Sequence, residues 1–79
     1  MKLLNKVKAG DFEGKVYETT LFGKTTYTYK IFYKIGKKSI CIDRCYVYLF
    51  DKEDCYHRMK DALDSALGMR ENLLNLKGC

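Results

Sequence analysis

Apolar and polar residues alternate along three stretches of the chain, which short polar turns separate. The stretches are residues 15–22 (KVYETTLF), 25–35 (TTYTYKIFYKI) and 39–50 (SICIDRCYVYLF). Alternation of this kind, rich in β-branched and aromatic residues, predicts β-strands with one buried face. Gly23-Lys24 and Gly36-Lys37 separate the strands, and Gly at the first position of a two-residue loop is typical of a type II′ hairpin. The three strands are therefore expected to form an antiparallel meander.

The remainder of the chain has helical periodicity. The apolar positions with helical spacing are Met59, Ala62, Leu63, Ala66 and Leu67. Asp51 is the predicted N-cap, and acidic residues follow it in the first turn, where they favour the helix dipole. Gly68 either ends this helix or only weakens it, so residues 69–77 form a second short helix or continue a long bent one.

These elements predict an α+β fold in which residues 1–79 form a single basic β-β-β-α domain. The sheet is a three-stranded or four-stranded antiparallel meander, and a C-terminal helix or helix pair packs on one face. The sequence does not decide the structure of residues 1–14, which could add either a strand at 3–8 or a short helix. A chain of 79 residues buries only a small core, so we also expect a homodimer.

Two-residue loops at both glycine turns fix a strand register and assign each side chain to a face. Ile31 lies opposite Val16 in one hairpin and opposite Ile42 in the other. The face that the helix is expected to cover collects Val16, Tyr27, Ile31, Tyr33, Ile40, Ile42, Tyr46 and Tyr48. The opposite face carries lysines with Phe32 and Tyr17 among them, and Lys30 is expected to pair with Asp43 across the strands.

The net charge of +5 is unevenly placed, because residues 1–38 carry nine lysines against three acids. Such a one-sided excess indicates a polyanionic partner. Lysines among aromatic rings fit RNA, whose phosphates meet ammonium groups and whose unpaired bases stack on rings. The predicted nucleic-acid-binding residues are Lys15, Lys24, Lys30, Phe32, Lys34, Lys37 and Lys38. An ordinary solvated face, with lysines that protect edge strands, is the alternative explanation of the same pattern.

Other functional classes find no support in the sequence. It contains no P-loop, nucleotide fingerprint or nucleophile elbow, so we expect no enzyme, no catalytic residues and no cofactor. A zinc site of Cys41, Cys45, Cys55 and His57 is conceivable, but the spacing disfavours it, and reduced, mostly buried thiols are the expectation. With no membrane span and no signal peptide, a cytoplasmic location is expected.

As a whole, and in FGKTTYTYKIFYKIGKKSICIDRCYVYLFDKEDCYHRMKDAL in particular, the sequence resembles the small early host-takeover proteins of T-even-type bacteriophages. One of these is an RNA-binding inhibitor of an RNA-antitoxin/endoribonuclease system. The resemblance implies an RNA-binding protein of the host cell cytoplasm that counteracts a host-defence or toxin–antitoxin component. The alternative is a protein-interaction module that inhibits or adapts a host protein directly, without nucleic acid, through an apolar patch near the LLNLK tail at residues 73–77. Besides RNA, a host protein or ribonucleoprotein is thus a candidate partner.

Overall fold

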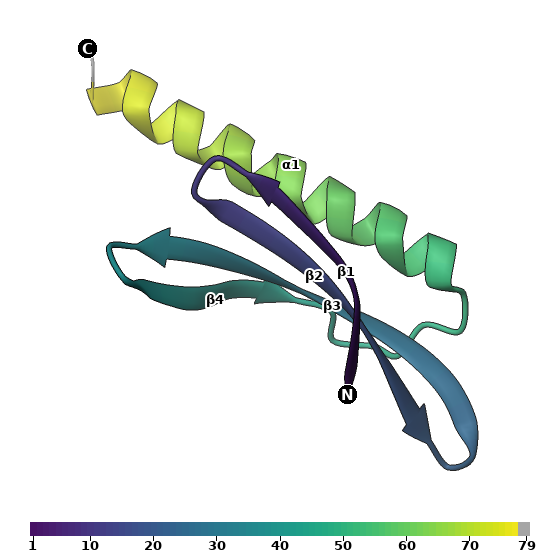
Figure 1. Cartoon of the computed structure of the whole chain (residues 1–79). Helices are drawn as coiled ribbons and strands as arrows, with labels where there is room; N and C mark the ends of the chain where they lie inside the picture. The colour runs from purple at the N-terminus through teal and green to yellow at the C-terminus, as the bar shows by residue number, and fades with distance from the viewer. Residues whose placement is uncertain (78–79) are drawn as a thin grey trace.

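A single antiparallel sheet with one long helix across it makes up the fold (Figure 1). The computed structural model describes residues 1–77, and it describes the side chains of residues 1–69. The elements are β1 (Lys2–Ala9), β2 (Phe12–Leu21), β3 (Lys24–Ile35), β4 (Lys38–Arg44) and α1 (Lys52–Lys77). Strand order in the sheet is β1-β2-β3-β4, which confirms the α+β prediction and shows that the N-terminal segment adds the fourth strand.

The helix begins as the sequence predicts. The backbone N–H groups of Glu53 and Asp54 donate hydrogen bonds to Oδ1 of Asp51, at 2.9 and 3.4 Å. Asp51 is therefore the N-cap, satisfying donors that the first helical turn leaves without partners. α1 then runs without a break through Gly68, so the residues after this glycine continue one helix.

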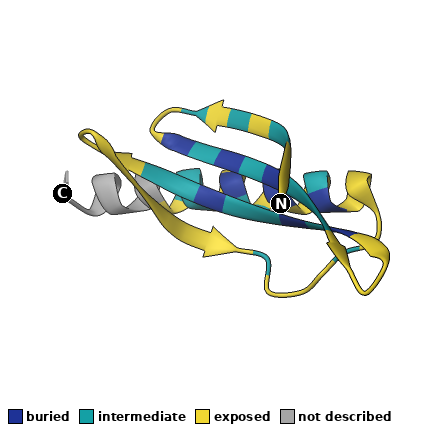
Figure 2. Ribbon diagram, turned by 60° about the horizontal axis from the view of Figure 1, so that its bottom comes forward, coloured by how far each residue is buried: buried dark blue, intermediate teal, exposed yellow. Residues whose placement is uncertain are grey.

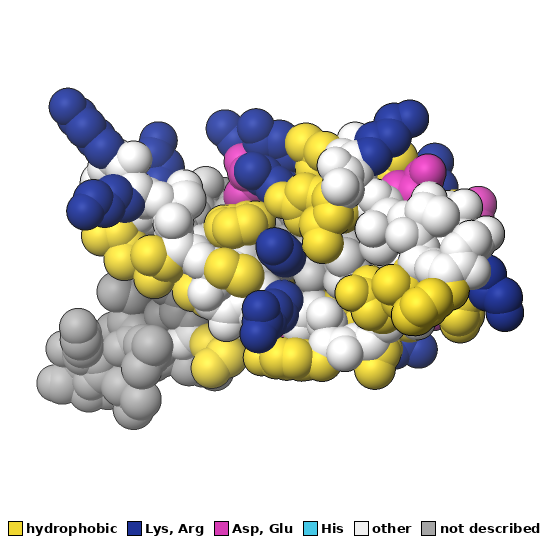
Figure 3. Space-filling view, turned by 90° about the horizontal axis from the view of Figure 1, so that it is seen from below, with side chains coloured by type: hydrophobic (Ala, Val, Ile, Leu, Met, Phe, Trp, Pro, Cys, Tyr) yellow, Lys and Arg dark blue, Asp and Glu magenta, His cyan; other side chains and the backbone are white. Residues whose placement is uncertain are grey.

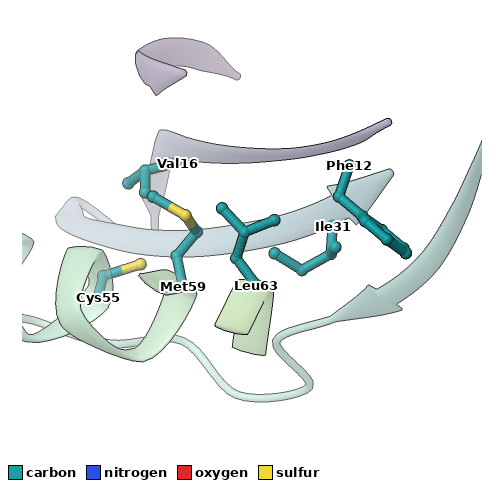
Figure 4. Close-up of a cluster of buried hydrophobic side chains, with 6 residues drawn as sticks. All are labelled: Phe12, Val16, Ile31, Cys55, Met59 and Leu63. Atoms are coloured by element: carbon teal, nitrogen blue, oxygen red, sulfur yellow. The ribbon is translucent and has the colours of Figure 1, made fainter. Parts of the chain in front are cut away.

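The core lies between α1 and the middle of the sheet. Its buried members are Phe12, Val16, Ile31, Cys55, Met59 and Leu63, three from the strands and three from the helix (Figure 4). The helical members recur every four residues, so one stripe of α1 meets the sheet. Figure 2 shows buried positions along β2 and β3, whereas every residue of β4 is exposed.

The helix packs closely against the sheet at Gly14 of β2. A Cβ atom at this position would collide with Sδ of Met59 and lie 3.3 Å from Cδ1 of Ile31. Both neighbouring side chains are fully buried. The absence of a side chain at residue 14 therefore leaves the space that Met59 fills.

The first hairpin turn differs from the predicted one. Leu21 pairs with Lys24, so the turn residues are Phe22 and Gly23, with φ values of 51° and 77°. Positive φ at both positions is the type I′ pattern, whose twist matches that of the strands. The register consequently slides by two residues, and Val16 lies opposite Tyr29 instead of Ile31. A slide of two preserves the assignment of side chains to faces.

The second hairpin has the predicted turn but contains a β-bulge that the sequence pattern did not reveal. Gly36 has φ of 60°, and Ile35 pairs with Lys38 as expected. Phe32 pairs with Cys41, yet Ile31 pairs with Asp43, so Ile42 is an extra residue in β4. Beyond this bulge the faces exchange, and Lys30 lies opposite Arg44. The predicted pair of Lys30 with Asp43 is wrong.

Part of the predicted helix-facing set is uncovered. The helix packs over β1, β2 and β3, so Ile40 and Ile42 of β4 remain exposed. Tyr46 and Tyr48 lie in the segment after β4 and are also exposed. Of the residues predicted to face the helix, only those on β2 and β3 belong to the core or pack against it.

Two glycine-to-alanine substitutions should change stability in opposite directions. Gly14→Ala should lower the free energy of unfolding by about 1–3 kcal/mol, because Met59 has to move within a packed core. Gly68→Ala should raise it by up to about 1 kcal/mol, because this glycine lies inside α1 with open space around it. Urea denaturation of both variants measures the effects, and equal stability of the two would contradict the packing described for Gly14.

Candidate nucleic-acid interface

A row of cations crosses the sheet on the face away from α1, which is called the open face below. Lys6 pairs with Lys15, Lys15 with Lys30, and Lys30 with Arg44. These four residues, one from each strand, are named the cationic row. Neighbouring strands lie about 4.8 Å apart, so the row spans about 14 Å. In Figure 3, which views the molecule from below, Lys and Arg side chains stand among hydrophobic ones with few acids between them.

The two ends of the cationic row differ in electrostatics. Glu13 lies at the β1–β2 end, with carboxylate oxygens 3.7 Å from Nζ of Lys6, 4.0 Å from that of Lys8 and 3.2 Å from that of Lys15. Its side chain is only 19% exposed, which strengthens these interactions. One carboxylate thus offsets the repulsion among three ammonium groups.

The β3–β4 end of the row has no such counterion. Like charges directly opposite each other destabilise a sheet. Among the side chains that the structure describes, no carboxylate lies at ion-pair distance from Lys30 or Arg44. The neighbouring Asp43 instead accepts a hydrogen bond from the backbone N–H of Arg44, at 2.8 Å. This end of the row therefore carries the least compensated positive charge on the open face.

Aromatic rings lie beside three cations of the row. Nζ of Lys15 is 5.0 Å from the ring centre of Phe32, and Nζ of Lys30 is 5.6 Å from that of Tyr17. The guanidinium carbon of Arg44 is 5.4 Å from the ring centre of Tyr46. Cation–π contacts at these distances hold the charged groups near the rings. The open face thus presents charge and stackable surface together.

The structure brings together four of the seven predicted binding residues. Lys15, Lys30, Phe32 and Lys34 lie on the open face. Lys37 is in the β3–β4 turn, and Lys38 lies opposite Ile35 on the helix-facing side. Lys24 is at the far end of β3, about 33 Å along the strand from Lys34. The last three residues are therefore not part of the cationic row.

Sequence reasoning missed Lys6 and Arg44. Lys6 becomes part of the site because the N-terminal segment forms β1, an assignment that the sequence left open. Arg44 reaches the open face only because of the bulge at Ile42, and alternation alone placed it on the other side. The lysine-rich composition of residues 2–8 was the available signal for the first; no local signal indicated the second.

A second surface feature lies on the helix-facing side. A groove of about 560 Å³ runs between α1 and β4. It is lined by Phe12, Tyr33, Ile42, Asp43, Ala62, Ser65, Ala66 and Met69. The LLNLK tail, predicted to form an apolar patch, lies outside the residues whose side chains are described.

The three cysteines within the described part of the chain lie in three different environments. Cys41 is exposed on β4, Cys45 is half-buried and Cys55 is fully buried in the first turn of α1. The prediction of mostly buried thiols is therefore correct for Cys55 and wrong for Cys41. No cluster of three or more His, Cys, Asp or Glu side chains suited to a metal ion occurs in the described part of the chain.

Comparison of this chain with protein-family models, with curated proteins and with solved structures gave no match. In the part of the chain that the structure describes, no helix is both long and apolar enough to cross a membrane. The functional proposal therefore depends on the geometry of the open face.

The two thiols Cys41 and Cys55 should differ sharply in alkylation. Burial raises the pKa of Cys55 from 9.0 to about 11, which lowers its thiolate fraction near pH 8 by about a hundredfold. Iodoacetamide at pH 8 should therefore modify Cys41 in the folded protein and Cys55 only after denaturation. Peptide mass spectrometry locates the label, and early modification of Cys55 would contradict its place in the core.

Proposed function

We propose that this protein binds RNA through its open face, with the cationic row contacting phosphates and with little sequence preference. The observation that carries the proposal is the row itself: four cations paired directly across four strands, with no helix over them. Maintaining such a row costs stability, because like charges repel at strand spacing. A polyanion bound along the open face would remove that repulsion.

The shape of the open face favours RNA over duplex DNA. A four-stranded sheet is too broad to enter a major groove, which admits a helix or a two-stranded ribbon, and the single helix lies on the opposite side of the sheet (Figure 1). Rings beside cations suit single strands, whose bases can leave the stack and contact aromatic side chains, and the ring of Tyr46 is exposed for such a contact. Every nucleotide has a phosphate and every base has a flat face that can stack on a ring, whatever the sequence. Contacts of these two kinds therefore account for the low sequence preference.

The biological setting that we propose is counteraction of a host-defence or toxin–antitoxin component in a bacterial host cell. Its support is the resemblance of the whole sequence to small early proteins of T-even-type bacteriophages. A small basic RNA-binding protein would act on such a system by occupying its RNA antitoxin. The function requires no catalysis by the chain itself.

Affinity for RNA should fall steeply with salt. Neutralisation of about four phosphates predicts a slope near −3 in a plot of log affinity against log salt concentration. Lys15→Glu with Lys30→Glu should abolish binding, whereas Lys52→Glu with Lys60→Glu on α1 makes the same charge change and should weaken binding far less. Fluorescence anisotropy with labelled RNA measures both. A flat salt response, or equal loss in the two double variants, would contradict the proposal.

The groove beside β4 favours a second candidate function, protein–protein interaction, with a second copy of this chain as the occupant. β4 is one of the two edge strands of the sheet and is exposed throughout, so its backbone N–H and C=O groups can pair with another strand. An antiparallel partner strand would also shield Ile40 and Ile42, which α1 leaves uncovered. The dimer expected from the small size of the core would form at this edge.

Light scattering after nuclease treatment tests this second function. The wild-type chain should have the mass of a dimer, and Ile40→Lys should produce a monomer, because a charge replaces an apolar contact. Phe22→Lys is the matched control, since Phe22 is 96% exposed at the distant hairpin turn. A wild-type monomer at about 0.1 mM would exclude a dimer of useful stability.

A further inference from the structure

The β3–β4 end of the cationic row adjoins a hollow of about 300 Å³ on the molecular surface. Among the side chains that line it are Thr28, Lys30, Arg44, Tyr46 and Tyr48. It therefore combines two cations that have no acidic counterion among the described side chains, two tyrosine rings and a hydroxyl. A charged group and an aromatic surface lie within the reach of one small ligand.

Hydrogen bonds fix the segment that carries the two tyrosines. At its start, the N–H of Cys45 donates to the carbonyl of Tyr29 at 2.9 Å. At its end, Leu49 and Tyr27 exchange backbone hydrogen bonds of 2.7 and 3.0 Å. The three residues between these anchors, 46–48, form a bend that belongs to no strand. The segment is thus held at both ends, which lowers the entropy lost when a ligand binds its side chains.

Tyr46 has the exposure that a stacking platform needs. It is 81% exposed, although it lies only two residues after the end of β4, and its ring faces the guanidinium of Arg44. An exposed ring beside an uncompensated cation provides one site for a base and one for its phosphate. Thr28 lies at the same hollow, where its hydroxyl donates to the carbonyl of Cys45 at 3.5 Å.

We propose that Lys30, Arg44 and Tyr46 form a subsite for one nucleotide of single-stranded RNA. The phosphate lies between the Lys30 ammonium and the Arg44 guanidinium, and the unpaired base stacks on Tyr46. The subsite rests on the proposed RNA-binding function and deepens it, because it gives the open face a preference for unpaired over duplex RNA. In a duplex, the base is paired and stacked and cannot reach the ring.

The two cations are tested with a labelled 12-nucleotide oligouridylate, which forms no duplex. Arg44→Gln and Lys30→Gln should each lower its affinity about tenfold, the loss expected for a hydrogen bond between charged groups. The double variant should lose less than the product of the two effects, because both cations hold one phosphate. Lys60→Gln, with the same charge change on α1, should change affinity less than about twofold.

The stacking partner is tested separately. Tyr46→Leu should lower oligouridylate affinity about tenfold and leave the salt slope unchanged, whereas Tyr46→Phe should retain wild-type binding. The chain has no Trp, so Tyr46→Trp introduces a single tryptophan as a fluorescent reporter. Its fluorescence should be quenched by oligouridylate but not by heparin, a polyanion without bases, or by a 12-base-pair RNA duplex. Thermal unfolding of each variant serves as the check on folding.

The outcomes separate the subsite from the general function. If the wild type binds RNA with the expected salt slope but Arg44→Gln and Tyr46→Leu bind as tightly as Lys60→Gln, the subsite is wrong and the RNA-binding function stands. Equal quenching of Tyr46→Trp by heparin also overturns the stacking assignment. If the wild type binds no RNA, the proposed function fails and the subsite fails with it.

Discussion

The close contact between Met59 and Gly14 sets how near the helix lies to the sheet, and the burial of the core depends on it. Because residue 14 has no side chain, α1 approaches β2 closely and buries Val16 and Ile31 beneath it. A single helix over a four-stranded sheet can cover only one side. The cations lie on the opposite side, and the edge strand β4 is exposed along its whole length. The core therefore lies on the face that α1 approaches, and the cationic row lies on the other.

Electrostatic strain on the open face is distributed unevenly. Glu13 offsets the lysines of β1 and β2, so that part of the row is close to an ordinary surface ion-pair network, which contributes little net stability. At the β3–β4 end of the row, the bulge at Ile42 increases the repulsion, because it places Arg44 instead of Asp43 opposite Lys30. One inserted residue thus removes a carboxylate and adds a guanidinium at the same point of the surface. A sheet selected only for stability would favour the uninterrupted register.

The sequence predicted the features that depend on local chemistry. Asp51 caps the helix, Gly36 forms the second turn, and alternation assigned Lys15, Lys30 and Phe32 to the open face correctly. Alternation determines only the side of each residue, however, and it does not determine how far one strand slides along another. The turn at Phe22 and the bulge at Ile42 are set by strand twist and tertiary packing, and the sequence window contains no signal for either. Arg44, the residue that completes the cationic row, could therefore not be assigned from the sequence.

The order of the strands in the sheet is the same as their order in the chain, and this has a consequence for folding kinetics. Each strand pairs with the one that precedes it through a short turn, so few contacts of the sheet require closure of a long loop. Topologies with such low contact order cross their folding barriers faster than sandwiches or parallel sheets of equal size. The hairpins can assemble while the ribosome is still adding the helix, which then closes over a preformed surface. A chain with this topology can reach its native structure without waiting for strands that are distant in the sequence to find each other.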